Sequence, residues 1–266
     1  MQGCFLFPAS LPSPLAFFPL NLLLLDKRFS SLFLAKDDPR TVHLLEVLKV
    51  QEGDEIDLAV RNGPKGKGIV SLPGEGAIKL EIRWLEPHPR DLHPVRLILG
   101  LARPQTCRKI LEQASALGVE RMAFFEAEKG EPSYAHSSLW QTHEWMERID
   151  RGIEQSFSSF IPSCTVYSSL EETLVSEMTD RNPQKFALDN YESPEPLSAV
   201  GIERGSPVLL ALGPERGWSA AERELLRSVN FEFRHLGERV LRLETAAVAA
   251  LGIVLASYWR EDSESW

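Results

Sequence analysis

The sequence predicts an α/β protein in two parts, a small β-barrel over residues 21–88 and a parallel-sheet domain over residues 95–266. Up to residue 85, brief apolar or alternating runs are separated by turn sequences such as RNGPKGKG and PGEG. After residue 94, near-continuous apolar runs alternate with helical patterns, which is typical of a parallel α/β sheet. Between these parts, the segment EPHPRDLHP contains three prolines and is interpreted as a linker.

The first part is expected to contain five short strands and one helix. The helix covers residues 40–50, with Val42, Leu45 and Leu48 on one face. Glycines in the connecting segments supply the positive φ angles that tight turns require. The expected strands cover residues 21–25, 30–35, 54–60, 66–72 and 77–85.

The second part is expected to alternate strands with helices. After a buried strand at 95–102, the segment 103–119 carries the pattern of a helix, and Gly118 is its expected stop. Ser137 or Ser138 is expected to cap one long helix over residues 139–157. The last helix, 244–260, is rich in small residues, so another helix can approach it closely. The remaining strands are expected at 121–128, 185–189, 207–213 and 231–237, and the inward side chains of the helix at 103–119 are Ile110, Leu111, Ala114 and Leu117.

The composition indicates a globular, acidic protein. Its 266 residues are 43% hydrophobic and 25% charged, with a net charge of −9. The overall field therefore does not indicate a nucleic-acid binder, although a local basic face can work within an acidic protein. Three cysteines, at positions 4, 107 and 164, form neither a CxxC pair nor a disulfide framework. This pattern suits a reducing compartment, and we expect a cytoplasmic protein.

The first 25 residues are apolar, but they do not read as a signal peptide or a membrane helix. No Lys or Arg precedes Lys27, so the basic region of a signal peptide is missing. Four prolines, at positions 8, 12, 14 and 19, would break a membrane helix. We therefore expect residues 1–20 to be a disordered or mis-called extension, and we expect no membrane partner.

Common catalytic signatures are absent from the sequence. It contains no GxxxxGK[ST], no GxGxxG after a strand, no GxSxG and no HExxH. The six histidines do not cluster with the cysteines, so no metal site is expected. These absences argue against the usual nucleotide-binding, hydrolase and zinc sites.

The segment PVLLALGPERGWSAAERELL, residues 207–226, holds the first candidate binding loop. A buried strand stops at Gly213, Pro214 fixes φ, and Gly217 permits an unusual backbone conformation. Ser219 and Glu222 form a capping box, so a helix should begin at about Ala220. The loop thus lies outside the carboxyl end of a parallel strand, where open α/β sheets bind ligands. By itself it also fits an ordinary strand-to-helix turn.

A second loop of the same kind follows in HLGERVLRLETAA, residues 235–247. Gly237 ends the strand, and Arg239 and Arg242 stand among apolar residues. A buried arginine needs a partner, most simply the carboxylate of Glu215 or Glu244. Two strand ends of this type favour a binding pocket as strongly as they favour two plain turns.

The two segments LALGPERGWSAAEREL and LGERVLRLETAAVAAL resemble the paired signature of the RsmE family within the SPOUT superfamily. Weaker similarity extends over most of the chain from Asn21. The resemblance implies a PUA-like N-terminal barrel that binds RNA and a C-terminal domain with a deep trefoil knot. It also implies a homodimer that uses S-adenosylmethionine to methylate N3 of a uridine in small-subunit (16S) ribosomal RNA, on free rRNA or on an assembled small ribosomal subunit.

The resemblance assigns residues to the cofactor loops, with leucines expected to flank the adenine and glycines to expose backbone. Arg242 is also the candidate catalytic residue, either for electrostatic stabilisation or for organising its loop, and no general base can be named. The implied cofactor-binding residues are Leu188, Leu212, Gly213, Glu215, Gly217, Leu236, Gly237, Val240, Leu241, Arg242, Thr245 and Ala246.

The residues expected to contact RNA match the family pattern less well than the residues expected to bind the cofactor. Arg61, Lys65 and Lys67 are candidates for phosphate contacts, and a solvated hairpin tip is the equal alternative. The chain departs from the family pattern at 128–134 and 154–159, where family arginines expected to face the RNA are missing. The alternatives are therefore a SPOUT enzyme with another RNA target, or an inactive homologue that binds RNA or cofactor.

Overall fold

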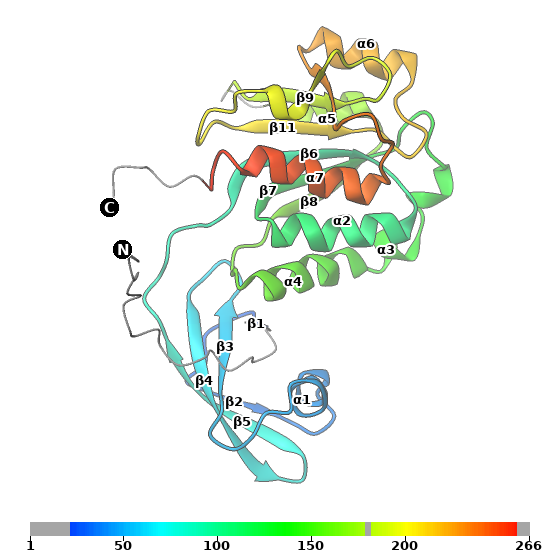
Figure 1. The fold of residues 1–266 in the computed structure, drawn as a ribbon. Helices are drawn as coiled ribbons and strands as arrows, with labels where there is room; N and C mark the ends of the chain where they lie inside the picture. Colours follow the sequence, from blue (N-terminus) through cyan, green and yellow to red (C-terminus); the bar gives the residue numbers. More distant parts are fainter. Residues whose placement is uncertain (1–21, 179–181, 260–266) are drawn as a thin grey trace, which may run out of the picture.

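The computed structural model describes residues 22–178 and 182–259, which form two sheets with helices around the larger one (Figure 1). The expectation for residues 1–20 therefore lies outside the described residues. Within the described ranges, no helix is both long and apolar enough to cross a membrane.

The N-terminal sheet has five strands in the order β1-β3-β4-β5-β2. β1 pairs with β3 in parallel, and the other pairs are antiparallel. Inward side chains from the strands and from Leu44 build one apolar core. All five strands expected from the sequence are present: β1 Leu23–Leu25, β2 Ser31–Leu34, β3 Glu55–Val60, β4 Lys65–Gly74 and β5 Ala77–Trp84.

The helix expected at 40–50 exists, and two of its three predicted inward residues, Leu45 and Leu48, pack against the core, whereas the prediction for Val42 is wrong. It consists of α1 (Pro39–Val42) followed by the π-helical turn η1 (His43–Val47). Thr41 and Leu44 are buried, whereas Val42 is 42% exposed. In the π turn the Leu48 amide donates to the His43 carbonyl, five residues back. This wider turn departs from the 3.6-residue period used for the prediction, so Val42 does not share the inward face of Leu45 and Leu48.

The C-terminal sheet has seven strands in the order β10-β12-β9-β11-β6-β7-β8, and every pairing is parallel. The expected parallel sheet is therefore confirmed. β11 is buried along its whole length at the centre of the sheet. Two short strands, β8 and β10, were not expected from the sequence. The strands are β6 His93–Gly100, β7 Val119–Phe125, β8 Ser163–Tyr167, β9 Gln184–Leu188, β10 Glu195–Pro196, β11 Val208–Leu212 and β12 Glu232–His235.

Helices cover both faces of this sheet (Figure 1). Alternate side chains of β6 and β11 belong to different cores, because successive residues of a strand point to opposite faces. One core includes α2, α4 and α7, and the other includes α5 and α6. The helices are α2 Pro104–Ala116, α3 Ser138–Gln141, α4 Glu144–Ser156, α5 Leu170–Glu177, α6 Ala220–Ser228 and α7 Leu243–Leu255, with short 3₁₀ turns η2 Pro132–Tyr134 and η3 Leu197–Ala199.

The prediction of one long helix over 139–157 is wrong, because the chain forms two helices there. α3 ends at Gln141, and His143 adopts a left-handed conformation with φ of 62° before α4 begins. The Thr142 hydroxyl donates to the Ser138 carbonyl, a local bond that competes with helix continuation. The Ser137 side chain makes no capping hydrogen bond to α3.

The two sheets are joined by direct contacts. Leu22, Leu24 and Ala59 pack into the core that lies under α2, α4 and α7. The Asn62 amide donates to the Ser159 carbonyl at 2.7 Å. The Ser159 hydroxyl in turn donates to the carbonyl of Gly63, also at 2.7 Å. These bonds hold the N-terminal sheet against the end of α4.

Candidate functional site

A pocket of about 280 Å³ lies at the carboxyl ends of β9, β11 and β12. Its walls come from the three segments that follow these strands, so the sheet topology brings together residues far apart in sequence. Of the twelve residues assigned to cofactor binding, nine line this pocket: Leu188, Leu212, Gly213, Glu215, Gly217, Leu236, Val240, Leu241 and Ala246. Gly237, Arg242 and Thr245 do not line it.

The first wall is the loop between β11 and α6. A Cβ on Gly213 would lie 3.1 Å from the Trp218 ring, so the loop folds tightly over this glycine. Gly217 has φ of +68°, as the sequence indicates. The expected capping box is present, with Ser219 and Glu222 bonding reciprocally at the start of α6. Trp218 is buried, and its indole N–H donates to the Leu188 carbonyl at 2.8 Å.

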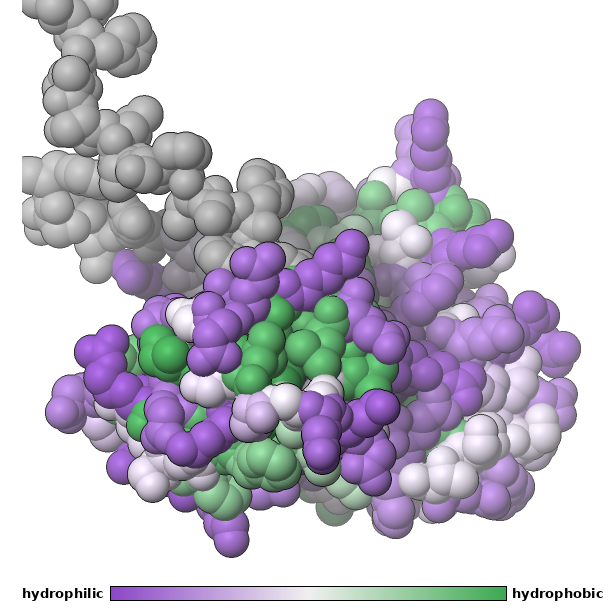
Figure 2. All heavy atoms as spheres, turned by 90° about the horizontal axis from the view of Figure 1, so that it is seen from below, coloured by the Kyte–Doolittle hydropathy of each residue, from purple (hydrophilic) through white to green (hydrophobic). Residues whose placement is uncertain are grey.

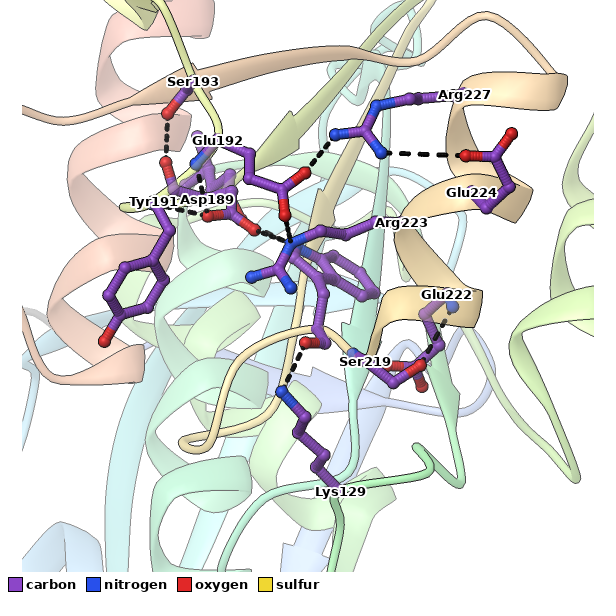
Figure 3. Close-up of polar contacts among 12 residues, drawn as sticks. Lys129, Asp189, Tyr191, Glu192, Ser193, Ser219, Glu222, Arg223, Glu224 and Arg227 are labelled. Carbon is purple, nitrogen blue, oxygen red and sulfur yellow. Dashed lines mark hydrogen bonds and ion pairs between the residues drawn. The ribbon is translucent and has the colours of Figure 1, made fainter.

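The second wall is the segment after β9. The Asp189 carboxylate accepts hydrogen bonds from the amides of Tyr191 and Glu192 at 2.6 and 3.1 Å. Arg223 of α6 donates to the same carboxylate at 2.6 Å (Figure 3). Both side chains of this ion pair are largely withdrawn from solvent, with exposures of 12% for Arg223 and 2% for Asp189. Two walls of the pocket are thus tied together through α6.

The third wall is the segment between β12 and α7. Gly237 has φ of +109°, and its amide donates to His235 Nδ1 at 3.0 Å. Arg239 and Arg242 are both exposed, so the expectation that they are buried is wrong. Because their guanidinium groups reach solvent, neither needs the carboxylate partner that burial would demand.

The two carboxylates proposed as partners for these arginines accept hydrogen bonds from other residues. Glu244 accepts from the ammonium group of Lys109 at 3.1 Å. Glu215 accepts from the backbone amide of Arg103 at 3.0 Å. Glu215 thus connects the first wall to the start of α2.

A second cavity, of about 520 Å³, adjoins this pocket. Glu215, Arg216, Leu241 and Leu243 line both cavities. The second cavity alone is lined by Arg103, Gln105, Thr106, Lys109, Lys129, Gly130, Glu131, Tyr134, Arg242 and Glu244. Arg242, which also provides the N-cap position of α7, therefore lies beyond the mouth of the first pocket.

Arg61, a candidate phosphate contact, makes ion pairs within the protein. Its guanidinium donates to Asp150 of α4 and to Asp26, the latter at 3.0 Å. These bonds, the one to Asp150 first, raise the pKa of Arg61 against the opposing effect of burial. Arg61 therefore serves to attach the N-terminal sheet to α4.

Lys67 is similarly engaged, by Asp57 at 2.9 Å and Glu55 at 3.3 Å. Lys65 stands at the start of β4 and makes no ion pair among the described residues.

Seen from the side of the N-terminal sheet, apolar side chains gather in the middle of the face, with polar ones around them (Figure 2). An RNA contact by this domain stays a prediction.

The two segments that depart from the family pattern have different surroundings. Lys129 and Tyr134, from the segment 128–134, line the second cavity. In the segment 154–159, Ser158 and Ser159 are 8% and 0% exposed. The Ser158 hydroxyl donates to Asp91 of the linker. The expectation that these two serines face RNA is wrong, because their side chains bond within the protein.

The two cysteines in the described ranges are not activated thiols. Burial raises the pKa of Cys107 to about 12. Burial also raises the pKa of Cys164. A thiol at neutral pH is a poor nucleophile, so neither cysteine is suited to covalent catalysis. Over residues 22–178 and 182–259, no group of three or more His, Cys, Asp or Glu side chains could hold a metal ion.

Sequence reasoning missed the residues that hold the pocket walls. Arg223, Trp218 and Tyr191 all line the first pocket. The Arg223–Asp189 pair joins positions 34 residues apart. A single arginine in a helix gives no signal of such a partner, but Arg223 lies one turn after the capping serine, on the side of the helix nearest the loop.

Replacing Arg223 with alanine is expected to weaken binding of S-adenosylmethionine, the cofactor that the sequence resemblance implies, by about tenfold, or about 1.4 kcal/mol. The segment after β9 would lose its buried ion pair with α6 and keep the more exposed Arg227–Glu192 pair, and the Asp189 carboxylate would keep only its two backbone donors. Arg223→Lys should restore part of the affinity because it keeps the charge. The measurement is isothermal titration calorimetry. Arg151→Ala, which changes an exposed arginine of α4 outside the first pocket, is the matched control, and equal losses in both variants would contradict this role.

Comparison with known proteins identifies the class of this chain. Residues 89–255 match the model of the RNA methyltransferase domain family. The structure is similar to that of ribosomal RNA small subunit methyltransferase E from Neisseria gonorrhoeae bound to S-adenosylmethionine. The TM-score is 0.72 and the identity 21%, covering 90% of this chain and 98% of that one. A methyltransferase from Legionella pneumophila with bound S-adenosylmethionine gives a TM-score of 0.71, at 21% identity over 89% and 97% of the two chains.

The parallel sheet, its pocket and the domain match together define an RNA methyltransferase. Sequence relatives narrow the class. Ribosomal RNA small subunit methyltransferase E of Treponema pallidum is 34% identical over 224 residues, covering 83% of this chain and 84% of that protein. The protein of the same name from Bacillus subtilis is 25% identical, covering 80% of this chain and 85% of that protein. The chain belongs to the ribosomal RNA small subunit methyltransferase E (RsmE) family, which confirms the resemblance drawn from its sequence.

Proposed function

We propose that this protein transfers the methyl group of S-adenosylmethionine to N3 of a uridine in small-subunit ribosomal RNA. The observation that carries the proposal is the first pocket, whose walls include the two motif loops at the ends of β11 and β12. Relatives named ribosomal RNA small subunit methyltransferase E support the RNA substrate.

The pocket residues fit the cofactor chemically. Leu188, Leu212, Leu236 and Leu241 offer apolar surface for the faces of an adenine ring. The loop at Gly213 brings backbone amides and carbonyls close to the cavity, where they can bond the edge of the ring. When bound, the sulfonium of S-adenosylmethionine would supply an electrophilic methyl group.

The chain's own residues would then position the two reactants and manage charge. As the N3–methyl bond forms and the sulfur–methyl bond breaks, the N3 proton must leave the uracil. Arg242 lines the second cavity, beyond the mouth of the first pocket. Its cationic group can stabilise negative charge on a uracil ring held between the two cavities. Holding methyl donor and acceptor in line supplies most of the acceleration.

The variant Arg242→Ala tests the two roles left open for this residue. Because Arg242 does not line the first pocket, we expect the affinity for S-adenosylmethionine to stay within about threefold of wild type. The rate of methyl transfer should fall about 100-fold, as when one electrostatic stabiliser is removed. Calorimetry and single-turnover transfer of a radiolabelled methyl group measure the two quantities. Loss of cofactor binding would instead assign Arg242 to organising its loop.

The identity of the target requires a nucleotide-resolved map of rRNA methylation in a deletion strain. We expect one uridine-N3 methyl group to disappear from the small-subunit rRNA and to return when the gene is restored. If that methyl group persists, the chain acts on another RNA or is inactive. A different target is favoured by one specific observation, the departure from the family pattern at 128–134, because Lys129 and Tyr134 of this segment line the second cavity.

The same proposal includes a trefoil knot, a PUA-like N-terminal sheet that binds RNA, and a homodimer. The TM-score of 0.72 with an RsmE structure over 90% of the chain supports the fold. Light scattering should give about twice the 29.9 kDa of one chain if the protein is a dimer. A mass of one chain would contradict that part of the proposal.

A further inference from the structure

The second cavity adjoins the first pocket, because Glu215, Arg216, Leu241 and Leu243 line both. Its lining residues come from the start of α2, from the segment 129–134, and from the segment before α7. At about 520 Å³ it is the larger of the two. A group held there would lie next to whatever fills the first pocket.

Cations dominate the lining of this cavity. Five basic side chains, Arg103, Lys109, Lys129, Arg216 and Arg242, face three carboxylates, those of Glu131, Glu215 and Glu244. This excess stands out in a chain with a net charge of −9. Local positive charge in an acidic protein attracts an anionic ligand to that place.

Within the described part of the chain, four of these five cations make no ion pair with a carboxylate. They are Arg103, Arg216, Arg242 and Lys129, whose ammonium group donates to a carbonyl, whereas Lys109 pairs with Glu244 at 3.1 Å. By contrast Arg108 of α2, the helix whose N-cap residue is Arg103, pairs with Glu144 at 2.7 Å. Unpaired guanidinium groups around one cavity are suited to bind phosphate oxygens.

The cavity also has an aromatic wall. Tyr134 ends the 3₁₀ turn η2, lines the cavity and is only partly exposed. Leu241 and Leu243, which line both cavities, add apolar surface on the side next to the first pocket. A tyrosine ring together with guanidinium groups is the combination on which single-stranded bases stack while their phosphates are held.

The segment that carries Tyr134 is anchored to α6. The Glu128 amide donates to the Glu222 carboxylate at 3.0 Å. The Lys129 ammonium donates to the Trp218 carbonyl at 2.7 Å (Figure 3). Trp218 and Glu222 also shape the first pocket and its helix. The aromatic wall is therefore held in a defined position relative to the cofactor loops.

From this geometry we infer that the second cavity binds a single-stranded nucleotide of the RNA substrate, with Tyr134 stacking on a base and Arg103 holding a backbone phosphate. The inference rests on the proposed function, since it assumes that the methyl donor occupies the neighbouring pocket. It names Tyr134 and Arg103 as residues that determine RNA binding. Neither lines the first pocket, so their side chains can be changed separately from the cofactor site.

The test measures fluorescence anisotropy of a fluorescein-labelled oligouridylate of about 12 nucleotides, at several salt concentrations. Tyr134→Ala should weaken binding by about 5- to 100-fold, and Tyr134→Phe should retain it, because stacking needs the ring and not the hydroxyl. Arg103→Ala should weaken binding and lower the salt dependence by the equivalent of one phosphate contact, a slope change of about 0.7. Arg103→Lys should restore the salt dependence.

Two controls separate this inference from the proposed function. Arg151→Ala removes an exposed arginine of α4 and should leave RNA binding unchanged. Calorimetry with S-adenosylmethionine should give wild-type affinity for both Tyr134→Ala and Arg103→Ala. Absence of oligouridylate binding by the wild type, or wild-type binding by both alanine variants, overturns the inference while cofactor binding stands. Failure of the wild type to bind S-adenosylmethionine instead overturns the proposed function.

Discussion

Replacing Glu177 with alanine is expected to lower the free energy of unfolding by about 3–5 kcal/mol. The Glu177 carboxylate is 0% exposed at the end of α5. Arg121 donates to it at 2.6 Å, and the Tyr167 hydroxyl donates at 2.9 Å. Arg96 lies 3.6 Å from its other oxygen. Truncating Glu177 removes the charge that these partners share, leaves the Tyr167 hydroxyl without its acceptor, and leaves Arg121 with no carboxylate partner among the described residues.

Urea denaturation followed by circular dichroism measures this loss. Glu177→Gln keeps an oxygen acceptor and should cost less, about 1–3 kcal/mol. Glu171→Ala, on the exposed side of the same helix, is the matched control and should change stability by less than about 1 kcal/mol. A cost for Glu177→Ala no greater than that for Glu171→Ala would show that the buried network contributes little.

The Gly100→Ala variant is expected to bind S-adenosylmethionine about 10- to 100-fold more weakly. A Cβ on Gly100 would lie 2.6 Å from Pro214 Cδ and 2.7 Å from Pro214 N. The proline backbone cannot move aside like a flexible side chain, so the loop after β11 must shift. Overpacking of this kind costs about 1–3 kcal/mol. Because Gly213 and Pro214 line the first pocket, the displaced loop reduces its fit to the cofactor.

Calorimetry gives the affinity, and thermal denaturation reports whether the fold survives. Gly201→Ala is the matched control, since a Cβ there meets nothing within 4 Å. Its affinity should match the wild type. A Gly100→Ala protein that binds the cofactor as tightly as the wild type would indicate that the loop adapts without cost.

Local sequence signals predicted most elements of the fold. β11 is an apolar run that ends in Gly213, and such a run needs no long-range information to be recognised as a buried strand. The capping box at Ser219 likewise marks the start of α6 through contacts three residues apart. β8 was not predicted from the sequence. Four of its five side chains are not fully buried, so its sequence has no strong apolar pattern.

Where the predictions were wrong, the deciding interactions were local but had no signature in the hydrophobic pattern. The π turn at His43–Val47 leaves Val42 off the face that Leu45 and Leu48 turn to the core, and the left-handed His143 divides one expected helix into α3 and α4. The burial expected for Arg239 and Arg242 failed for another reason. Apolar neighbours in sequence do not bury a side chain when the segment runs along the surface.

The sequence by itself determined the two-part α/β organisation, the glycine-marked strand ends and the family to which the chain belongs. Only the tertiary structure decided how the pocket is held together. The contacts of Arg223 with Asp189, of Trp218 with Leu188 and of Gly100 with Pro214 join residues that are 30 or more positions apart. Parallel strands bring such residues to one edge of a sheet, whereas sequence periodicity reports only on neighbours within a helix or strand.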